Sequence, residues 1–249
     1  WCYKTEPDET MNNRSIRYPR GKTLGGSSSI NGLLWVRGQS EDYNIWRQLG
    51  NKGWGWDDIL PYFLKSENNE LGKSEFHNDK GPITVANKKI NLKLLDEFQN
   101  AAEEYGIPKT IDFNKGDNTG VGFFQFTTSF NNIGLKLRCS AAKGYLNPAK
   151  KRKNLKIEVK SHVQKINFEG KKAISVSYYS GNKLKTVKVN KEVILSSGSI
   201  GSPQILQVSG IGDGEKLKKL GIDVVNDLKG VGKNLQDHLM MRPVYKVKN

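Results

Sequence analysis

The sequence of 249 residues can bury a hydrophobic core of its own, and 36% of its residues are hydrophobic, as in ordinary globular domains. The formal net charge of +15 at pH 7 does not favour a nucleic-acid-binding protein, because the lysines are scattered and do not gather with stacking aromatics on one element. The sequence also lacks the run of about 18 apolar residues that a membrane-spanning helix requires.

The ends of the sequence and its two cysteines restrict the interpretation further. The chain opens at Trp1 without an initiator Met and closes at Asn249, so we expect an interior fragment of a longer protein. Cys2 and Cys139 could pair as a disulfide, but two cysteines this far apart in sequence are more often free thiols, which is the favoured interpretation. Neither has a second Cys or a His at metal-ligand spacing, so no metal site is expected. The basic run 150–153 is interpreted as a solvated helix end, with an anion-binding patch as the alternative.

Two helices are expected in the first half of the chain. Residues 56–63 have a helical pattern with aspartates near its start. Apolar residues recur at helical spacing over 92–105, where Asn91 can cap the helix and Gly106 can end it.

The second half begins with a pattern of period two. The apolar runs 163–168, 173–179 and 184–189 are separated by glycine-containing turns and alternate with lysines, which predicts an antiparallel meander with one wet face. The expected elements that follow are a strand buried on both faces at 192–195, a helix that begins at Pro203 with Ser202 as its cap, a helix over 213–220, and a strand at 222–225. This irregular alternation predicts a mixed α/β fold in which insertions interrupt a nucleotide-binding core.

The sharpest motif is the glycine- and serine-rich stretch 21–32. Its paired glycines Gly25 and Gly26 allow a close approach of the backbone to a ligand, and consecutive N–H groups in such a turn can bind an anion. These features favour a phosphate-bearing ligand, whereas an ordinary Gly/Ser loop is an equally good interpretation of the stretch taken alone. A second stretch, 195–203, resembles a strand that enters a capped helix, where nucleotides often bind. Taken alone, it is better interpreted as a tight turn.

Together the two stretches resemble a known family. The segment GKTLGGSSSINGLLWVRGQSEDYN from Gly21 and the segment GSIGSPQILQVSGIG from Gly198 are similar to the two signatures of the glucose-methanol-choline oxidoreductases at every specified position. The resemblance extends over essentially the whole chain. The opening and the run 18–22 are most similar to the insect glucose-dehydrogenase-like branch.

The resemblance implies an FAD-binding, Rossmann-like domain that is discontinuous and interleaved with a substrate domain containing antiparallel sheet. The implied boundaries are FAD-binding segments at 1–70 and 151–212, a substrate or cap segment at 71–150, and a return towards the substrate domain at 213–249.

The resemblance also implies the cofactor and its binding residues. Family members that carry His where this chain has Asn31 bind the flavin covalently, so non-covalent FAD is expected here. Val163 is expected at the adenine, Ser197 and Gly198 are expected near the adenosine half, and Trp35 is a candidate for proximity to the flavin. The residues expected along the flavin and its pyrophosphate are Thr23, Gly25, Gly26, Ser27, Asn31, Gly32, Leu33 and Leu34.

No catalytic residue is expected within this chain. The family's catalytic His and its His or Asn partner are expected beyond Asn249, and its GxGxxG motif before Trp1. His77 and His162 are interpreted as surface or satisfied side chains, and His238 as part of a structural segment, with a catalytic role as the less favoured alternative.

The predicted activity is hydride transfer from the CH–OH group of an alcohol or sugar to FAD, with the electron acceptor left open, and the fragment alone is expected to be inactive. A truncated or decayed paralogue with a binding role is the alternative, and a basic nucleic-acid-binding protein is the rival from another class. Resemblance to the insect branch favours an extracellular protein.

Overall fold

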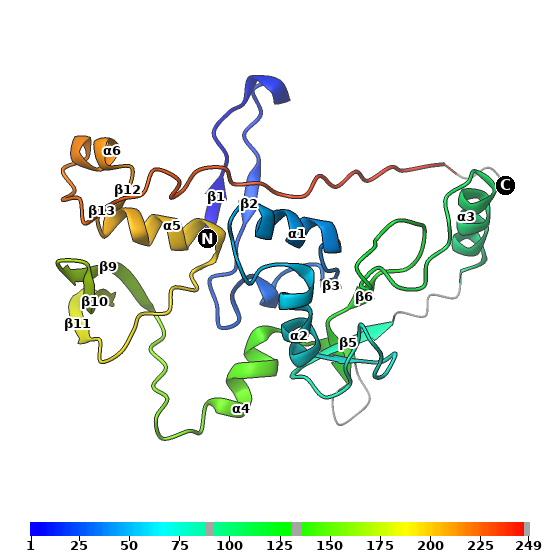
Figure 1. The fold of residues 1–249 in the computed structure, drawn as a ribbon, viewed down its shortest axis with the longest axis horizontal. Helices are drawn as coiled ribbons and strands as arrows, with labels where there is room; N and C mark the ends of the chain where they lie inside the picture. Colours follow the sequence, from blue (N-terminus) through cyan, green and yellow to red (C-terminus); the bar gives the residue numbers. More distant parts are fainter. Residues whose placement is uncertain (88–91, 131–135, 247–249) are drawn as a thin grey trace. The chain divides into compact units, whose positions relative to one another are not determined.

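A computed structural model describes residues 1–87, 92–130 and 136–246, which form two compact units, Trp1–Lys156 and Ile157–Asn249 (Figure 1). The four-part division into cofactor and substrate segments remains a prediction.

The first unit combines small sheets with short helices. Strands β3, β6, β5 and β4 form a mixed four-stranded sheet in that order, and the pairs β1–β2 and β7–β8 are antiparallel. Its elements are β1 (Cys2–Lys4), η1 (Glu9–Met11), β2 (Arg17–Pro19), η2 (Gly26–Ser29), β3 (Leu34–Trp35), α1 (Ser40–Gln48), α2 (Trp56–Ser66), β4 (Glu67–Asn69), β5 (Ile83–Asn87), α3 (Lys93–Glu104), β6 (Gln125–Phe126), β7 (Thr128–Phe130), β8 (Lys136–Arg138), the π-helix η3 (Ala142–Leu146) and α4 (Asn147–Ala149).

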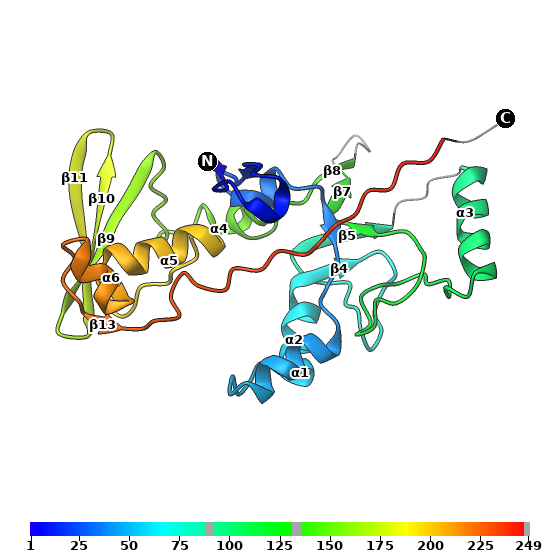
Figure 2. The same cartoon turned by 90° about the horizontal axis from the view of Figure 1, so that it is seen from above.

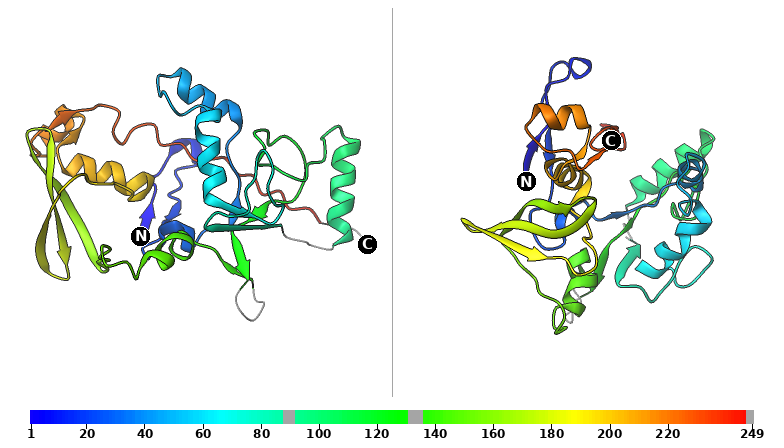
Figure 3. Two further views of the ribbon diagram at one scale, coloured as in Figure 1. Left: turned by 60° about the horizontal axis from the view of Figure 1, so that its bottom comes forward. Right: turned by 60° about the vertical axis from the view of Figure 1, so that its left-hand side comes forward.

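The two predicted helices of this unit are confirmed. Helix α2 begins at Trp56, where the Asp58 carboxylate accepts a hydrogen bond from Gly55 N at 3.0 Å, and it packs beside α1 through aromatic contacts (Figure 3). Helix α3 ends where Gly106 takes a left-handed φ of 95°. The expected cap Asn91 lies outside the described residues, and Leu92 holds the N-cap position.

The interior of the first unit is partly apolar and partly ionic. Ile83, Val85 and Cys139 form the apolar cluster, and Trp35 packs against it. Next to it lies a set of hydrogen-bonded polar side chains that we call the polar network: Arg37, Glu67, Asn69, His77, Asp112, Asn114 and Gln125, all buried.

Charged side chains form the centre of the polar network. Arg37 Nη2 lies 2.7 Å from Glu67 Oε1, and His77 Nδ1 lies 2.9 Å from the same oxygen. On its other side, His77 Nε2 lies 3.0 Å from Asp112 Oδ2. His77 is therefore satisfied, as expected, but it is a buried residue and not a surface one.

The two carboxylates hold His77 in its charged form. Burial alone would lower its pKa, but the hydrogen bonds and negative charges of Asp112 and Glu67 raise the pKa from 6.5 to about 9. Burial would likewise raise the pKa of each carboxyl group. The contacts with His77, and those of Arg37 with Glu67, outweigh burial and lower both pKa values.

The second unit contains the predicted meander. Strands β9 (Ser161–Glu169), β10 (Lys172–Ser180) and β11 (Lys183–Lys188) are antiparallel in the order β11-β10-β9. Gly170 and Gly181 supply positive φ angles at its two turns. Helix α5 (Gly198–Val208) lies against this sheet, where Ser209 Oγ accepts a hydrogen bond from Ile166 N at 2.9 Å (Figure 2).

The remaining elements of this unit follow α5. Helix α6 (Gly214–Lys219) is capped by Asp213 and confirms the helix expected at 213–220. Strands β12 (Ile211–Gly212) and β13 (Asn226–Asp227) pair in parallel on either side of it in the sequence.

Three expectations for this unit were wrong. Residues 192–195 form no strand and Ile194 is 80% exposed, because among the described residues no neighbouring strand pairs with this segment. Helix α5 does not begin at Pro203 but five residues earlier, at Gly198, so Ser202 lies within the helix and is not its cap. Pro203 lacks an N–H and removes one intrahelical hydrogen bond, but it does not end the helix. The strand expected at 222–225 is β13 at 226–227, because pairing with β12 sets its position.

Other expectations concern the cysteines, the basic run and the membrane. Both cysteines are free thiols, with Cys2 exposed and Cys139 buried. The run 150–153 follows directly after α4, which confirms its interpretation as a helix end. Within the described ranges, no helix is both long and apolar enough to cross a membrane.

The stability of the first unit should fall between neutral and alkaline pH. His77 binds its proton more tightly in the folded state than in the unfolded state. Its contribution is therefore fully present below pH 6.5 and is lost as the pH rises through about 9. All five tryptophans lie in this unit, so urea unfolding followed by tryptophan fluorescence reports on it alone. We expect a loss of about 3 kcal/mol from pH 6 to pH 10.

The substitution His77→Gln is the control for this pH dependence. The variant should be less stable than the wild type at pH 6, and its unfolding free energy should change far less towards pH 10. An equally steep alkaline loss in both proteins would contradict the assignment to His77.

Candidate functional site

The glycine- and serine-rich loop forms a compact turn that its own backbone holds together. Gly26 N donates to Thr23 O at 2.9 Å, and Ser27 O accepts from Ile30 N at 3.1 Å and Asn31 N at 2.8 Å. The turn contains the short helix η2, and Gly25 and Gly26 enter it with φ angles of 88° and 55°. Only glycine adopts these angles without strain, so the sequence pattern and the turn have the same physical cause.

The glycines of this loop differ in their surroundings. A Cβ on Gly25 would lie 2.5 Å from Ser29 Oγ and 3.1 Å from Ala142 Cβ, so Gly25 is needed for packing within the protein. At Gly26 and Gly32 a Cβ would meet nothing within 4 Å. The backbone is therefore uncovered at these two positions, as it is at other exposed glycines of the chain, and leaves room for a bound cofactor.

A second segment of the same unit fixes the loop from outside. Arg138 Nη1 donates to Asn31 Oδ1 at 2.6 Å and to Ser28 O at 3.2 Å. Ser28 Oγ accepts a hydrogen bond from Ala141 N at 2.9 Å. These contacts place a guanidinium cation at the loop, where it favours a negatively charged ligand.

The chain leaves the loop through a strained residue. Leu33 has a φ of 71°, in the left-handed region that residues other than glycine rarely adopt. Its N–H donates to Asn31 Oδ1 at 3.1 Å, and its carbonyl accepts from both Thr127 N at 2.8 Å and Thr127 Oγ1 at 3.1 Å. Leu34, the next residue, is 42% exposed. Strain of this kind persists where the surrounding contacts enforce it and often marks a functional site.

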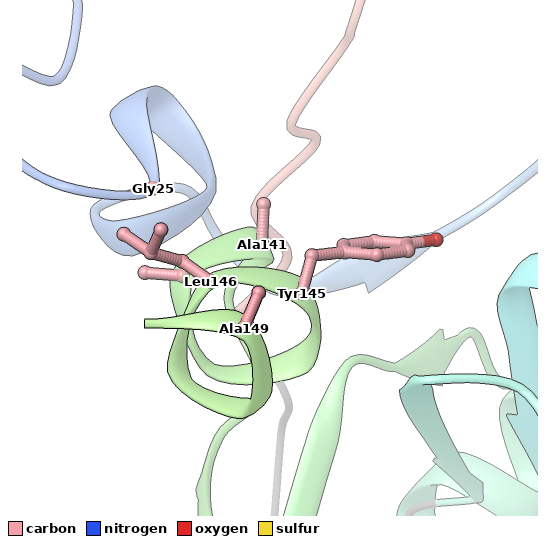
Figure 4. A pocket seen from close by; sticks show the side chains of 6 residues that line it. Gly25, Ala141, Tyr145, Leu146 and Ala149 are labelled. Carbon is pink, nitrogen blue, oxygen red and sulfur yellow. The ribbon is translucent and has the colours of Figure 1, made fainter. Parts of the chain in front are cut away.

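A small apolar hollow adjoins the loop. It has a volume of about 320 Å³ and lies between Gly25 and the π-helix η3 with the end of α4 (Figure 4). Its lining residues are Gly25, Ala141, Ala142, Tyr145, Leu146 and Ala149. The hollow offers no charged group, so it suits the apolar part of a ligand and not its phosphates.

The remaining predicted cofactor residues lie in the second unit, on two elements that pack together. Val163 is half-buried in β9, opposite Tyr178, while Ser197 is the N-cap of α5 and Gly198 is its first residue. Gly198 has a φ of 83° and, like Gly26, borders open space. The N-terminal end of a helix favours negative charge, which fits a nucleotide here.

A groove of about 470 Å³ runs beside these residues. It lies between the face of α5 that runs from Ser199 to Gln207 and the segment 232–236. Gln207 Nε2 donates to Val231 O at 3.0 Å and fixes the segment to the helix. The structure thus groups Thr23–Leu34 in the first unit, and Val163, Ser197 and Gly198 in the second.

The histidines supply no catalytic pair in the part of the chain that the structure describes. His162 and His238 are exposed, and His77 is bound between carboxylates. The described residues also contain no group of three His, Cys, Asp or Glu side chains arranged to hold a metal ion.

Sequence reasoning missed the contacts of Arg138 with the loop and the entire polar network. Glu67, His77 and Asp112 are separated by 10 and 35 positions along the chain, and no local pattern connects them.

The sequence of this chain is similar to a known protein family and to individual proteins. Residues 8–240 match the GMC oxidoreductase family. The chain is 43% identical over 250 residues to an oxygen-dependent choline dehydrogenase of Pectobacterium carotovorum, which covers 100% of this chain and 44% of that protein. It is 44% identical over 239 residues to the mitochondrial choline dehydrogenase of Homo sapiens, covering 96% of this chain and 39% of that protein. The chain thus spans less than half the length of these relatives.

Solved structures agree with the sequence comparison. An FAD-dependent oxidoreductase from Chaetomium thermophilum superimposes with a TM-score of 0.87 at 35% identity, over 94% of this chain and 42% of that one. Pyridoxine 4-oxidase from Mesorbium loti gives a TM-score of 0.87 at 29% identity, over 96% and 46%. The chain therefore belongs to the GMC oxidoreductase family and has the mixed α/β FAD-binding fold of that family.

Proposed function

We propose that this chain is part of a flavoenzyme that oxidises the CH–OH group of an alcohol or sugar. The observation that carries the proposal is the loop 23–34, where Gly26 and Gly32 leave open space beside the backbone in a chain of this family. When bound, FAD supplies the acceptor for the hydride that leaves the CH–OH carbon.

The described residues supply binding and orientation. Gly26 and Gly32 let the backbone approach the cofactor, and the guanidinium of Arg138 holds Asn31 and adds positive charge near the loop. The amide of Asn31 is bonded to Arg138 and to Leu33 N, and an amide does not form the covalent flavin bond that a histidine can form. Non-covalent FAD is therefore part of the proposal. Ser197 and Gly198 would hold the adenosine half at the start of α5.

The substrate class rests on the relatives. Both sequence relatives described above are choline dehydrogenases, and the solved structures include pyridoxine 4-oxidase and a fungal aryl-alcohol oxidase. Within this class we propose the insect glucose-dehydrogenase-like branch, supported by the run 18–22, and with it an extracellular location.

The proposal is tested on the protein that the complete transcript encodes. Its flavin content is measured from visible absorbance after release of the cofactor, and the protein is then mixed without oxygen with choline, glucose, benzyl alcohol and pyridoxine. We expect stoichiometric FAD, released by denaturation alone, and loss of flavin absorbance with one of these alcohols. Absence of flavin would contradict the proposal. Flavin that no alcohol reduces would instead support the alternative of a non-catalytic binding role.

The substitution Gly32→Ala tests the open space at the loop. The methyl group would meet nothing within 4 Å, and Gly32 does not have the left-handed φ that would strain alanine. We therefore expect an unchanged unfolding free energy without cofactor but a Kd for FAD raised about tenfold or more, because the methyl group occupies the space of the ligand. Fluorescence titration with FAD measures the Kd.

Gly25→Ala is the matched control. Its methyl group would collide with Ser29 and Ala142, and its φ of 88° would strain alanine, so this variant should lose stability without cofactor. Unchanged FAD affinity in Gly32→Ala would show that the open space beside Gly32 is not where the cofactor lies.

A further inference from the structure

The glycine- and serine-rich loop 21–32, which we call the cofactor loop, continues into the segment Leu33–Arg37, which we call the exit segment. The exit segment leads to the interior of the first unit. It begins at Leu33, whose φ of 71° is strained for a residue other than glycine. The local contacts of Leu33 with Asn31 and Thr127 hold one end. The other end must also be fixed, because a strained backbone relaxes unless both sides are held.

Two buried side chains fix this other end. Glu67 Oε2 accepts a hydrogen bond from Trp35 Nε1 at 3.1 Å. Asn114 Nδ2 donates to Trp35 O at 3.1 Å, and Asn114 Oδ1 accepts from Arg37 N at 2.7 Å. Glu67 also pairs with the guanidinium of Arg37 at 2.7 Å. The side chains of both Glu67 and Asn114 are completely or almost completely buried, so water cannot replace these bonds.

His77 links the two supports to each other. Its Nδ1 lies 2.9 Å from Glu67 Oε1, and its Nε2 lies 3.0 Å from Asp112 Oδ2. Asp112 in turn accepts a hydrogen bond from Asn114 N at 2.8 Å through its other oxygen. Both ring nitrogens face carboxylate oxygens, and both contacts are hydrogen bonds only when the ring carries two protons.

The surroundings of His77 contain no second cation in direct contact with it among the described residues. The charged groups that face the ring are Glu67 and Asp112. The amide nitrogen Nδ2 of Asn69, which donates to Gln125 Oε1 at 3.2 Å, lies 3.0 Å from Nδ1. The guanidinium of Arg37 pairs with the carboxylate of Glu67, and the positive charge of Lys115 helps to lower the pKa of Asp112. A neutral ring would leave one buried carboxylate without its hydrogen-bonded cation.

We propose that His77 is a positioning residue for the cofactor loop: its imidazolium holds Glu67 and Asp112, and through them the exit segment, in the geometry that binds FAD. The inference rests on the proposed function. It adds that cofactor affinity depends on a charge that lies in the interior of the unit and not at the cofactor loop itself.

A pH dependence of FAD affinity follows from this arrangement. When the ring loses its proton, the bond to one carboxylate is lost, and Leu33 is free to relax towards an ordinary φ angle. FAD binding must then restore the left-handed φ of Leu33, and the free energy that this requires weakens binding. We expect the Kd for FAD to rise as the pH passes about 9.

The test uses the complete protein encoded by the transcript, freed of flavin and titrated with FAD from pH 7 to pH 10. Quenching of flavin fluorescence gives the Kd. For the wild type we expect the Kd for FAD to rise about tenfold or more across this range. A tenfold change in Kd corresponds to a difference of about one unit between the pKa of His77 in the FAD-bound protein and in the FAD-free protein. For His77→Gln we expect a weak Kd at pH 7 that changes much less with pH.

Ile59→Ala is the matched control for a loss of stability alone. Ile59 is buried in α2 of the same unit, and its truncation removes apolar packing without removing any bond of the polar network. At a similar decrease in Tm, this variant should keep the wild-type Kd at pH 7 and the wild-type pH profile. The wild-type titration also tests the proposal without any substitution.

The outcomes separate the two proposals. Three results would overturn the positioning role while leaving FAD binding intact. They are a normal FAD affinity of His77→Gln at pH 7, a wild-type Kd that does not change with pH, and a loss of affinity in Ile59→Ala equal to that in His77→Gln. A wild-type protein that binds no FAD at any pH would overturn the proposed function and this inference with it.

Discussion

The imidazole of His77 lies between two buried carboxylates, 2.9 Å from Glu67 and 3.0 Å from Asp112. Burial of two carboxylates with a single guanidinium would be costly, and the protonated ring balances the remaining charge. From these two carboxylates, hydrogen bonds lead to Trp35 directly and, through Asn114, to Trp35 and Arg37. The geometry of the exit segment therefore depends on the charge state of one histidine.

This arrangement explains how a unit with a small apolar cluster can support a strained loop. Replacing a buried ion pair by apolar side chains is often neutral or favourable for stability, so the ionic centre is better understood as a source of defined geometry than of net stability. Its directed bonds fix the backbone at Trp35 and Arg37, while Thr127 and Asn31 fix Leu33. The cofactor loop is thus held by the interior on one side and by Arg138 on the other.

Features set by neighbours in the sequence could be predicted, and features set by distant contacts could not. The meander followed from alternating residues and its glycine turns, and α2 and α3 followed from apolar spacing and end signals. The strand expected at 192–195 was wrong because a strand buried on both faces needs partner strands, which residues in the segment itself do not reveal. The polar network could not be predicted for the same reason, because its contacts join residues far apart in the sequence. Arg37 and Asn114, for example, are 77 positions apart. The loop at Gly25 and Gly26 indicated an anion or nucleotide from its backbone freedom alone, but naming FAD required the family resemblance.

The central claim is that the open space beside Gly26 and Gly32 receives the cofactor while the polar network holds the backbone behind it. An experimental structure of the complete protein with FAD tests this most directly. We expect cofactor atoms in van der Waals contact with the backbone at both glycines, Leu33 still in the left-handed region, and His77 still bonded to Glu67 and Asp112. FAD bound away from both glycines, or Leu33 relaxed to an ordinary φ in the bound state, would contradict it.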